Sequence, residues 1–214
     1  NRNVRGRVND RATSPMSSRI RYFFDSESLR DYQPDYLSAT KLKQNISSNA
    51  AKQALVMAAA ATNLKPMTSP ETVFPKKSEA ELANLLSLAQ RSAAVLQPRI
   101  DVIYGQLLRG LPDRDRIQEE RWKAGYDLAM GRILAMKVRT DAYNLMLARA
   151  KAGMQFKSPR SDTWTLRPSN VVNVGSRTEK LAQQARIYLQ RVIEDHPGTP
   201  WEFLADRELN QPLG

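Results

Sequence analysis

The chain of 214 residues lacks cysteine, contains one histidine and has no apolar run long enough to cross a membrane. Without cysteine, disulfide bonds, thiolate metal ligands and cysteine nucleophiles are excluded. One histidine cannot by itself build a closed structural zinc site, and a membrane-spanning helix needs about 18 or more consecutive apolar residues. We therefore expect no cofactor, no bound transition metal and no membrane span.

Catalytic motifs are also scarce. Ser38 and Lys41 match the Ser-x-x-Lys pattern of penicillin-interacting enzymes, but the Ser-Asp-Asn and Lys-Thr-Gly motifs that accompany it are absent. The nine glycines are scattered, so no glycine-rich loop is present to cradle a phosphate. A single histidine at a helix end, such as His196, more often caps the helix than catalyses a reaction. We predict no catalytic residue and a non-enzymatic protein.

What the sequence does contain is positive charge. The formal net charge is +11 at pH 7, and residues 1–21 contribute +5 of it, from six arginines against Asp10 alone. These residues show no apolar periodicity, so we predict a basic linker or extended arm over 1–21 and a single helical domain over 22–214. Such an arm is either a solvated linker or a contact for an anionic surface. The arginines that would make this contact are Arg2, Arg5, Arg7, Arg11, Arg19 and Arg21.

Residues 78–109 carry the clearest helical pattern. Ser78 and Glu81 form a Ser-x-x-Glu capping box, which is typical of a helix start. Pro98 lies off the apolar seam, so we expect it to bend this helix without ending it. The seam consists of two heptad series, Leu82, Ala89, Leu96, Ile103 and Leu86, Ala93, Ile100, Leu107.

Residues 113–152 predict a second long helix, about 60 Å in length. Its matching seam is Ile117, Arg121, Ala124, Leu128, Gly131, Ala135, Val138, Ala142 and Leu145. Because several of these residues are small, the two helices can approach closely and form an antiparallel hairpin. We expect Gly131 to face the first helix near Ala93 or Leu96, and Lys137 to lie on the surface. The predicted fold is mainly α, with this hairpin packed against further helices and little or no β.

Shorter helices are predicted on either side of the hairpin. The range 36–62 favours helix, with a possible division at Asn45, Ser47 and Ser48. A short extended piece is expected near Trp164 or over 171–174. A helix over 178–195 is followed by another from residue 200. The stretch between them reads as a joint, because Gly198 suits the position after a helix and Thr199 begins a second capping box with Glu202.

Two resemblances add to this interpretation. Residues 182–209 are similar to the second helix and following turn of a tetratricopeptide repeat, but no second copy occurs at a 34-residue period. The stretches RIRYFFDSESLRDYQPDY (19–36), RWKAGYDLAMGRILAMKVRTDAYNLMLA (121–148) and HPGTPWEFLADRELNQPLG (196–214) resemble the C-terminal region of large bacterial proteins with an upstream von Willebrand factor A domain. Because residue 1 is asparagine, we expect the chain to be a fragment or a processed product.

The second resemblance implies an accessory helical module for scaffolding or protein–protein contact. Its partner would be its own upstream domain or another chain. The metal motif of the upstream domain type, Asp-x-Ser-x-Ser, is not reproduced, because the nearest string, Asp25-Ser26-Glu27-Ser28, has a different spacing. The alternative function is binding of nucleic acid or another anionic surface through the arginine arm, which predicts affinity that falls steeply with salt.

Overall fold

The computed structural model describes residues 24, 26–34, 36–62, 70–153, 155–156, 158 and 160–214. Helices account for 68% of these residues and strands for 3%, so the predicted mainly α fold is confirmed. None of the helices in these ranges has the length and apolarity that crossing a bilayer requires. The six arginines of the predicted arm lie outside the described part of the chain.

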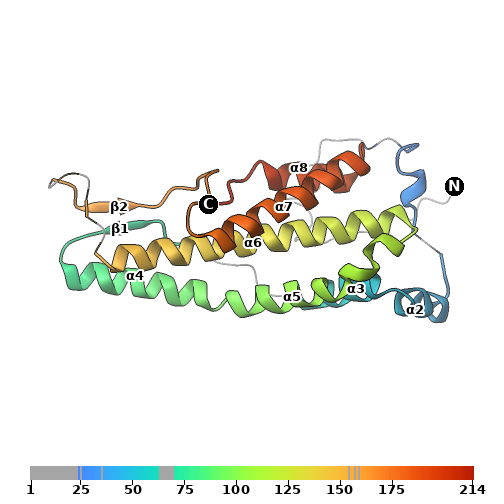
Figure 1. The fold of residues 1–214 in the computed structure, drawn as a ribbon, viewed down its shortest axis with the longest axis horizontal. Coiled ribbons are helices and arrows are strands. Elements are labelled where there is room, and N and C mark those ends of the chain that lie inside the picture. Colours follow the sequence, from blue (N-terminus) through green and yellow to red (C-terminus); the bar gives the residue numbers. More distant parts are fainter. Residues whose placement is uncertain are drawn as a thin grey trace, which may run out of the picture.

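The predicted hairpin is present and forms the long body of the molecule (Figure 1). Its first arm consists of α4 (Glu79–Ala94) and α5 (Gln97–Gly110), and α6 (Glu120–Lys151) returns beside both. The seam of the first arm is buried as expected, with Leu86 1% exposed and Leu107 0% exposed. Apolar side chains at heptad spacing therefore do bring the two arms together.

The expectation that Pro98 bends a continuous helix is wrong. α4 ends at Ala94, the next two residues form a turn, and α5 begins at Gln97. Pro98 thus lies in the first turn of α5, where its missing N–H costs no helical hydrogen bond. In one continuous helix that N–H would have to donate to the Ala94 carbonyl, so the chain starts a new helix instead.

The second arm begins later than predicted. A 3₁₀ helix, η2 (Leu111–Arg116), follows α5, and extended residues lead from it into α6 at Glu120. Ile117 ends η2 with φ −69° and ψ 126°, and its side chain is 1% exposed. The loop therefore contributes a core residue before the helix starts, and the 32-residue α6 is about 48 Å long rather than about 60 Å.

The predicted helix over 36–62 is divided, as its polar residues indicated. α2 (Ala39–Ser47) and α3 (Ala50–Ala61) are separate helices. Asn49 caps α3, and its Oδ1 accepts the N–H groups of Ala51 at 2.9 Å and Lys52 at 3.1 Å. α3 packs tightly against the end of α5, because a Cβ on Gly110 would lie only 2.6 Å from the Cα of Ala51.

On the other side of α6 lie α7 (Ser176–Asp195) and α8 (Pro200–Leu209) (Figure 1). Gly131 is buried at a close helix contact, as its place in the small seam predicts. Its neighbour is in α7, however: a Cβ there would lie 2.7 Å from both Cγ and Cδ2 of Leu189. The expectation that Gly131 faces Ala93 or Leu96 is therefore wrong.

Lys137 was expected on the surface, and this expectation is wrong because α6 is the central helix. This residue is 6% exposed, although it lies off the hairpin seam. The reason is that α5 covers one side of α6 and α7 covers another, so positions off one seam are buried by the second neighbour. Conversely, the seam positions Arg121 and Leu145 are exposed, Leu145 to 39%.

A small antiparallel ribbon covers the end of the hairpin near the start of α4. β1 (Val73–Pro75) pairs with β2 (Thr163–Thr165), and Phe74 lies opposite Trp164. Both side chains join the core that Leu86 and neighbouring residues of α4 and α6 form. The extended piece expected near Trp164 is confirmed, whereas 171–174 forms no strand.

Candidate functional site

A groove lies where α5, α6 and the first turn of α7 meet. Its larger part holds about 830 Å³, and a second hollow of about 440 Å³ continues from it along α7. We call the larger part the acidic half, because Asp101 and Asp141 line it. The smaller part is called the basic half, and its lining includes Lys180 and Gln184. The two halves share Tyr104, Lys137, Ser176 and Arg177.

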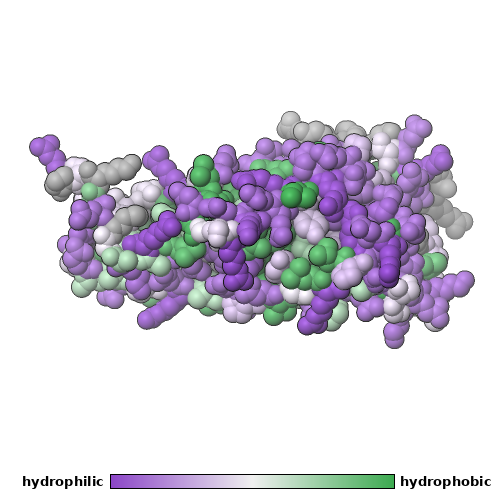
Figure 2. Space-filling view, viewed as in Figure 1, coloured by the Kyte–Doolittle hydropathy of each residue, from purple (hydrophilic) through white to green (hydrophobic). Residues whose placement is uncertain are grey.

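Figure 2 looks onto the face of the bundle that α5, α6 and α7 share. Hydrophilic side chains cover most of this face, and the hydrophobic patches between them are small. A broad apolar patch is the usual mark of a hydrophobic docking surface. This face therefore offers mainly charged and hydrogen-bonding groups to the solvent.

Lys137 forms the floor that both halves share. Its side chain is 8% exposed, and its Nζ lies 2.6 Å from Asp101 Oδ1 and 3.8 Å from Asp141 Oδ2. Burial raises the pKa of Asp141, while the charge of Lys137 opposes that shift. Gln97 also donates a hydrogen bond to Asp141 at 3.3 Å. In the acidic half Lys137 thus lies between two carboxylates, which ties α5 to α6.

The first turn of α7 meets the groove without a side-chain cap. Gly175 precedes it at φ 138° and ψ 148°, a conformation that other residues rarely adopt. Since glycine offers no side-chain acceptor, no hydrogen bond from the N–H groups of Ser176, Arg177 and Thr178 occurs within the described residues. Unpaired N–H groups and the helix dipole make this end of α7 positive.

Thr178, in the same turn, contributes a hydroxyl to the acidic half of the groove. The residue is 5% exposed and lines the groove. In the part of the chain that the structure describes, its side chain makes no hydrogen bond. Its oxygen is not among the enclosed side-chain atoms that lack a hydrogen-bond partner, so it is open to water in the groove.

The part of the groove whose lining suits an anion is the basic half. Arg177, Lys180 and Lys137 line the basic half, and no aspartate or glutamate does. No cluster of three or more histidine, aspartate or glutamate side chains suited to a metal occurs in the described ranges. The Ser38–Lys41 pattern is a helix cap, because the Ser38 hydroxyl accepts the Lys41 N–H at 3.4 Å.

His196 lies at the joint between α7 and α8, away from the groove. Gly198 has φ 71°, and Thr199 caps α8 by accepting the Glu202 N–H at 3.3 Å, as the capping box predicts. His196 is 0% exposed, and Tyr32 Oη lies 2.8 Å from its Nδ1. Its Nε2 has no partner among the described residues, and burial lowers its pKa. The stretch is a structural joint.

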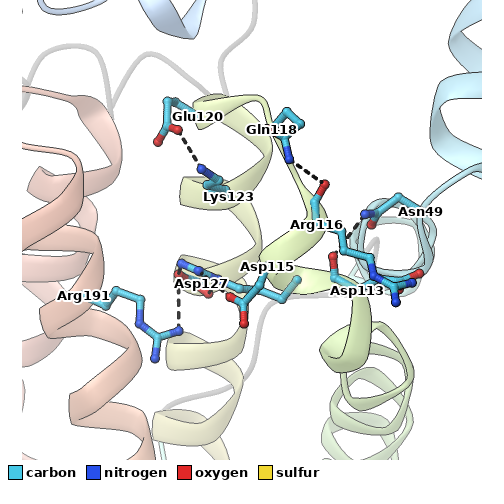
Figure 3. A network of polar contacts seen from close by, with 10 residues as sticks. Asn49, Asp113, Asp115, Arg116, Gln118, Glu120, Lys123, Asp127 and Arg191 are labelled. Carbon is cyan, nitrogen blue, oxygen red and sulfur yellow. Dashed lines mark hydrogen bonds and ion pairs between the residues drawn. The ribbon is translucent and has the colours of Figure 1, made fainter.

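A second polar cluster joins the loop between the hairpin arms to three helices (Figure 3). Asp127 on α6 is 0% exposed, accepts from Arg114 Nε at 3.1 Å and also pairs with Arg114 Nη2. Arg191 of α7 lies 3.8 Å from the same carboxylate. Asp113 accepts the backbone N–H of Ala50 at 3.0 Å, which attaches the loop to α3. These contacts hold the bundle together at this end.

Sequence reasoning did not identify the groove. It placed Lys137 on the surface and singled out no residue of the first turn of α7. Two local signals were present: Asp141 follows Lys137 by one helical turn, and Gly175 leaves the start of α7 uncapped. Asp101 carries no such signal, because its pairing with Lys137 depends on the register of two helices.

No protein-family model, curated protein or solved structure matches this chain. The resemblances to the von Willebrand factor A proteins and to a tetratricopeptide turn therefore stay predictions. The same holds for anion contact through the arginine arm, which lies outside the described residues.

Proposed function

We propose that this chain is a non-enzymatic helical interaction module that holds a segment of a partner protein in the groove between α5, α6 and α7. The groove is the observation that carries this proposal. Small-molecule sites are mostly apolar and bury most of their ligand. This groove combines charged and amide side chains with Tyr104, Leu145, Val174 and Leu181, and it continues along α7, which suits an extended chain of mixed polarity better.

The walls of the groove are held in place before any partner arrives. The Lys137–Asp101 ion pair joins α6 to α5 at 2.6 Å. Leu189 of α7 packs over Gly131 of α6 at close distance. A binding surface that is already ordered loses less conformational entropy when a partner binds. The partner segment belongs either to the protein's own upstream region or to a separate chain.

Site-specific photo-crosslinking in cells tests this proposal. A photo-reactive residue at Gln184, which lines the basic half, should capture a discrete protein partner or an upstream segment of the same protein. The matched control is the same residue at Val56 on α3, which is 41% exposed and lines neither half. A crosslinking pattern that is identical at the two positions would contradict the proposal.

A further inference from the structure

We infer that the outer face of the first hairpin arm is a second docking surface, whose occupant is an amphipathic helix of a partner protein with acidic residues beside its apolar seam. The surface consists of three exposed apolar side chains that we call the outer stripe: Leu88, Val95 and Val102. None of them lines either half of the groove, so this inference goes beyond the proposed function.

The spacing of the outer stripe is that of a coiled-coil seam. Its residues recur every seven positions, the repeat that keeps apolar side chains facing a partner helix. Each of them lies two positions after a buried residue of the same arm, as Val102 follows Ile100. Because two residues turn an α-helix by about 200°, the stripe points away from the core. The first arm therefore carries one apolar seam toward the core and a second toward the outside.

The described residues leave the outer stripe open along its length. Leu88 is 59% exposed, Val95 61% and Val102 57%. Figure 1 shows α4 and α5 following one another along one edge of the molecule, with α6 on their inner side. Val95 and Leu96, which join the two helices, both have right-handed helical backbone angles. The break between α4 and α5 therefore keeps the stripe on one side of the arm.

Positive charge borders the outer stripe. The bordering residues are three exposed arginines, Arg91, Arg99 and Arg109. The first two each lie four residues from Val95, so they are its neighbours on the helix surface. Among the described residues none of the three arginines has an ion-pair partner, and Glu81, at the α4 end of this face, already pairs with Lys77 at 3.3 Å. The stripe therefore lies between guanidinium groups that are free to pair with an incoming carboxylate.

These charges and the width of the stripe decide among occupants. The chain's own residues 1–21 carry +5, and a second copy would bring its own arginines to the stripe, so both place like charges together. A membrane surface calls for a broader apolar face, whereas Asn84 and Gln106, four residues beyond the two ends of the stripe, keep this one narrow. A helix with carboxylates beside its seam satisfies both the apolar row and the arginines.

The test uses three designed helical peptides of about three heptads each. The first has leucine along its seam and glutamate beside it, the second has lysine in place of glutamate, and the third keeps glutamate but has glutamine along the seam. Fluorescence anisotropy with the whole chain should show binding of the first peptide and at least about tenfold weaker binding of the other two. Equal binding of the three peptides, or no binding of the first, would overturn the inference.

Two double variants locate the binding. Leu88→Gln combined with Val102→Gln should weaken binding of the first peptide by about tenfold. The melting temperature should stay unchanged, because both side chains are exposed. The matched control is Val56→Gln combined with Met57→Gln on α3, where the side chains are 41% and 51% exposed, and it should have no effect on binding.

Arg91→Gln combined with Arg99→Gln should weaken the first peptide by about fivefold to tenfold and make the lysine peptide bind no worse than before. Lys41→Gln combined with Lys43→Gln on exposed α2 removes the same charge and is the control. Binding that neither the apolar nor the arginine pair of substitutions weakens overturns the assignment to the outer stripe.

The other occupants give distinct results. Dimerisation of the chain in sedimentation equilibrium that Leu88→Gln with Val102→Gln abolishes would assign the stripe to a second copy and overturn an acidic partner helix. Sedimentation with anionic phosphatidylserine vesicles that the same variant abolishes, at concentrations where the first peptide does not bind, would assign the stripe to a membrane surface and overturn the inference as well.

Discussion

Gly131 and Lys137, both on α6, show how a helix that is covered on two sides constrains single positions. At Gly131 even a Cβ atom would lie 2.7 Å from Leu189, so only glycine fits the observed helix spacing. At Lys137 the stem of the side chain is enclosed, and the ammonium group is accommodated because Asp101 and Asp141 lie within reach. A buried charge of this kind is tolerated only with such partners.

Gly131→Leu should destabilise the protein by about 1–3 kcal/mol, because the added side chain overpacks the contact between α6 and α7. The measurement is the free energy of unfolding in urea. Gly105→Leu on α5 is the matched control, since a Cβ there meets nothing within 4 Å, and it should be neutral or stabilising. Equal stability of the two variants would mean that α7 does not pack on Gly131.

Stability should depend on the protonation of His196. Burial, the largest effect, lowers its pKa, while Glu120, Asp195 and Asp127 oppose this and Arg114 reinforces it. The unfolded chain therefore takes up the proton first as the pH falls. The stabilising effect of the neutral ring should be complete above about pH 6.5 and be lost as the pH falls through the lower folded pKa, by at most about 1.4 kcal/mol per pH unit.

Urea unfolding at about pH 7.5 and about pH 5.5 measures this effect. In His196→Gln the part of the pH dependence that belongs to the imidazole should disappear, whatever the variant costs in packing. A pH dependence that is unchanged in the variant would assign it to other titratable groups.

At the scale of elements, helix ends decide where the chain turns. The break between α4 and α5, the 3₁₀ helix η2 and the division between α2 and α3 all lie at proline or capping residues. The capping residues differ in the number of hydrogen bonds that their side chains make. Among the described residues, the Ser78 hydroxyl is bonded to a single N–H group, that of Glu81 at 3.1 Å. Asn49 accepts two N–H groups of α3 and also donates to the Asp113 carbonyl at 3.1 Å, which joins α3 to η2.

Asn49→Ala should therefore cost more than Ser78→Ala. We expect about 1 kcal/mol for Ser78→Ala and about 2 kcal/mol for Asn49→Ala, the upper end of the range for a lost cap, because a contact between elements is lost as well. Thermal unfolding of the two single variants gives the comparison. A larger loss for Ser78→Ala would show that the Asn49–Asp113 contact contributes little to holding α3 in place.

At the scale of the whole molecule, helix packing and side-chain pairing hold the bundle together. Among the described residues, no group of three or more histidine, cysteine, aspartate or glutamate side chains is placed to hold a metal ion. Far-UV circular dichroism should show helix content well above the roughly one third that is average for globular proteins. Excess chelator should leave the melting temperature unchanged, since one histidine and no cysteine cannot close a structural zinc site. A chelator-dependent drop would indicate a metal bound by oxygen ligands.

The sequence by itself determined most of the elements and the pairing of the two hairpin arms. Heptad spacing identified the hairpin, because a seam that recurs every seven residues stays on one face of a helix. The sequence also predicted three local features: the Ser78 capping box, the joint at Gly198 and the division before Asn49. Caps and turns depend on residues within four positions of one another.

Only the tertiary structure decided which neighbour covers which face. Gly131 meets Leu189 across more than fifty residues of chain, and Lys137 meets Asp101 through the register of two helices. Periodicity reports that a helix has a buried face, but it does not report a second buried face when the helix is central, as in α6, where 15 of 32 residues are buried. The groove exists for the same reason: its two halves form only where the uncapped start of α7 docks beside Lys137.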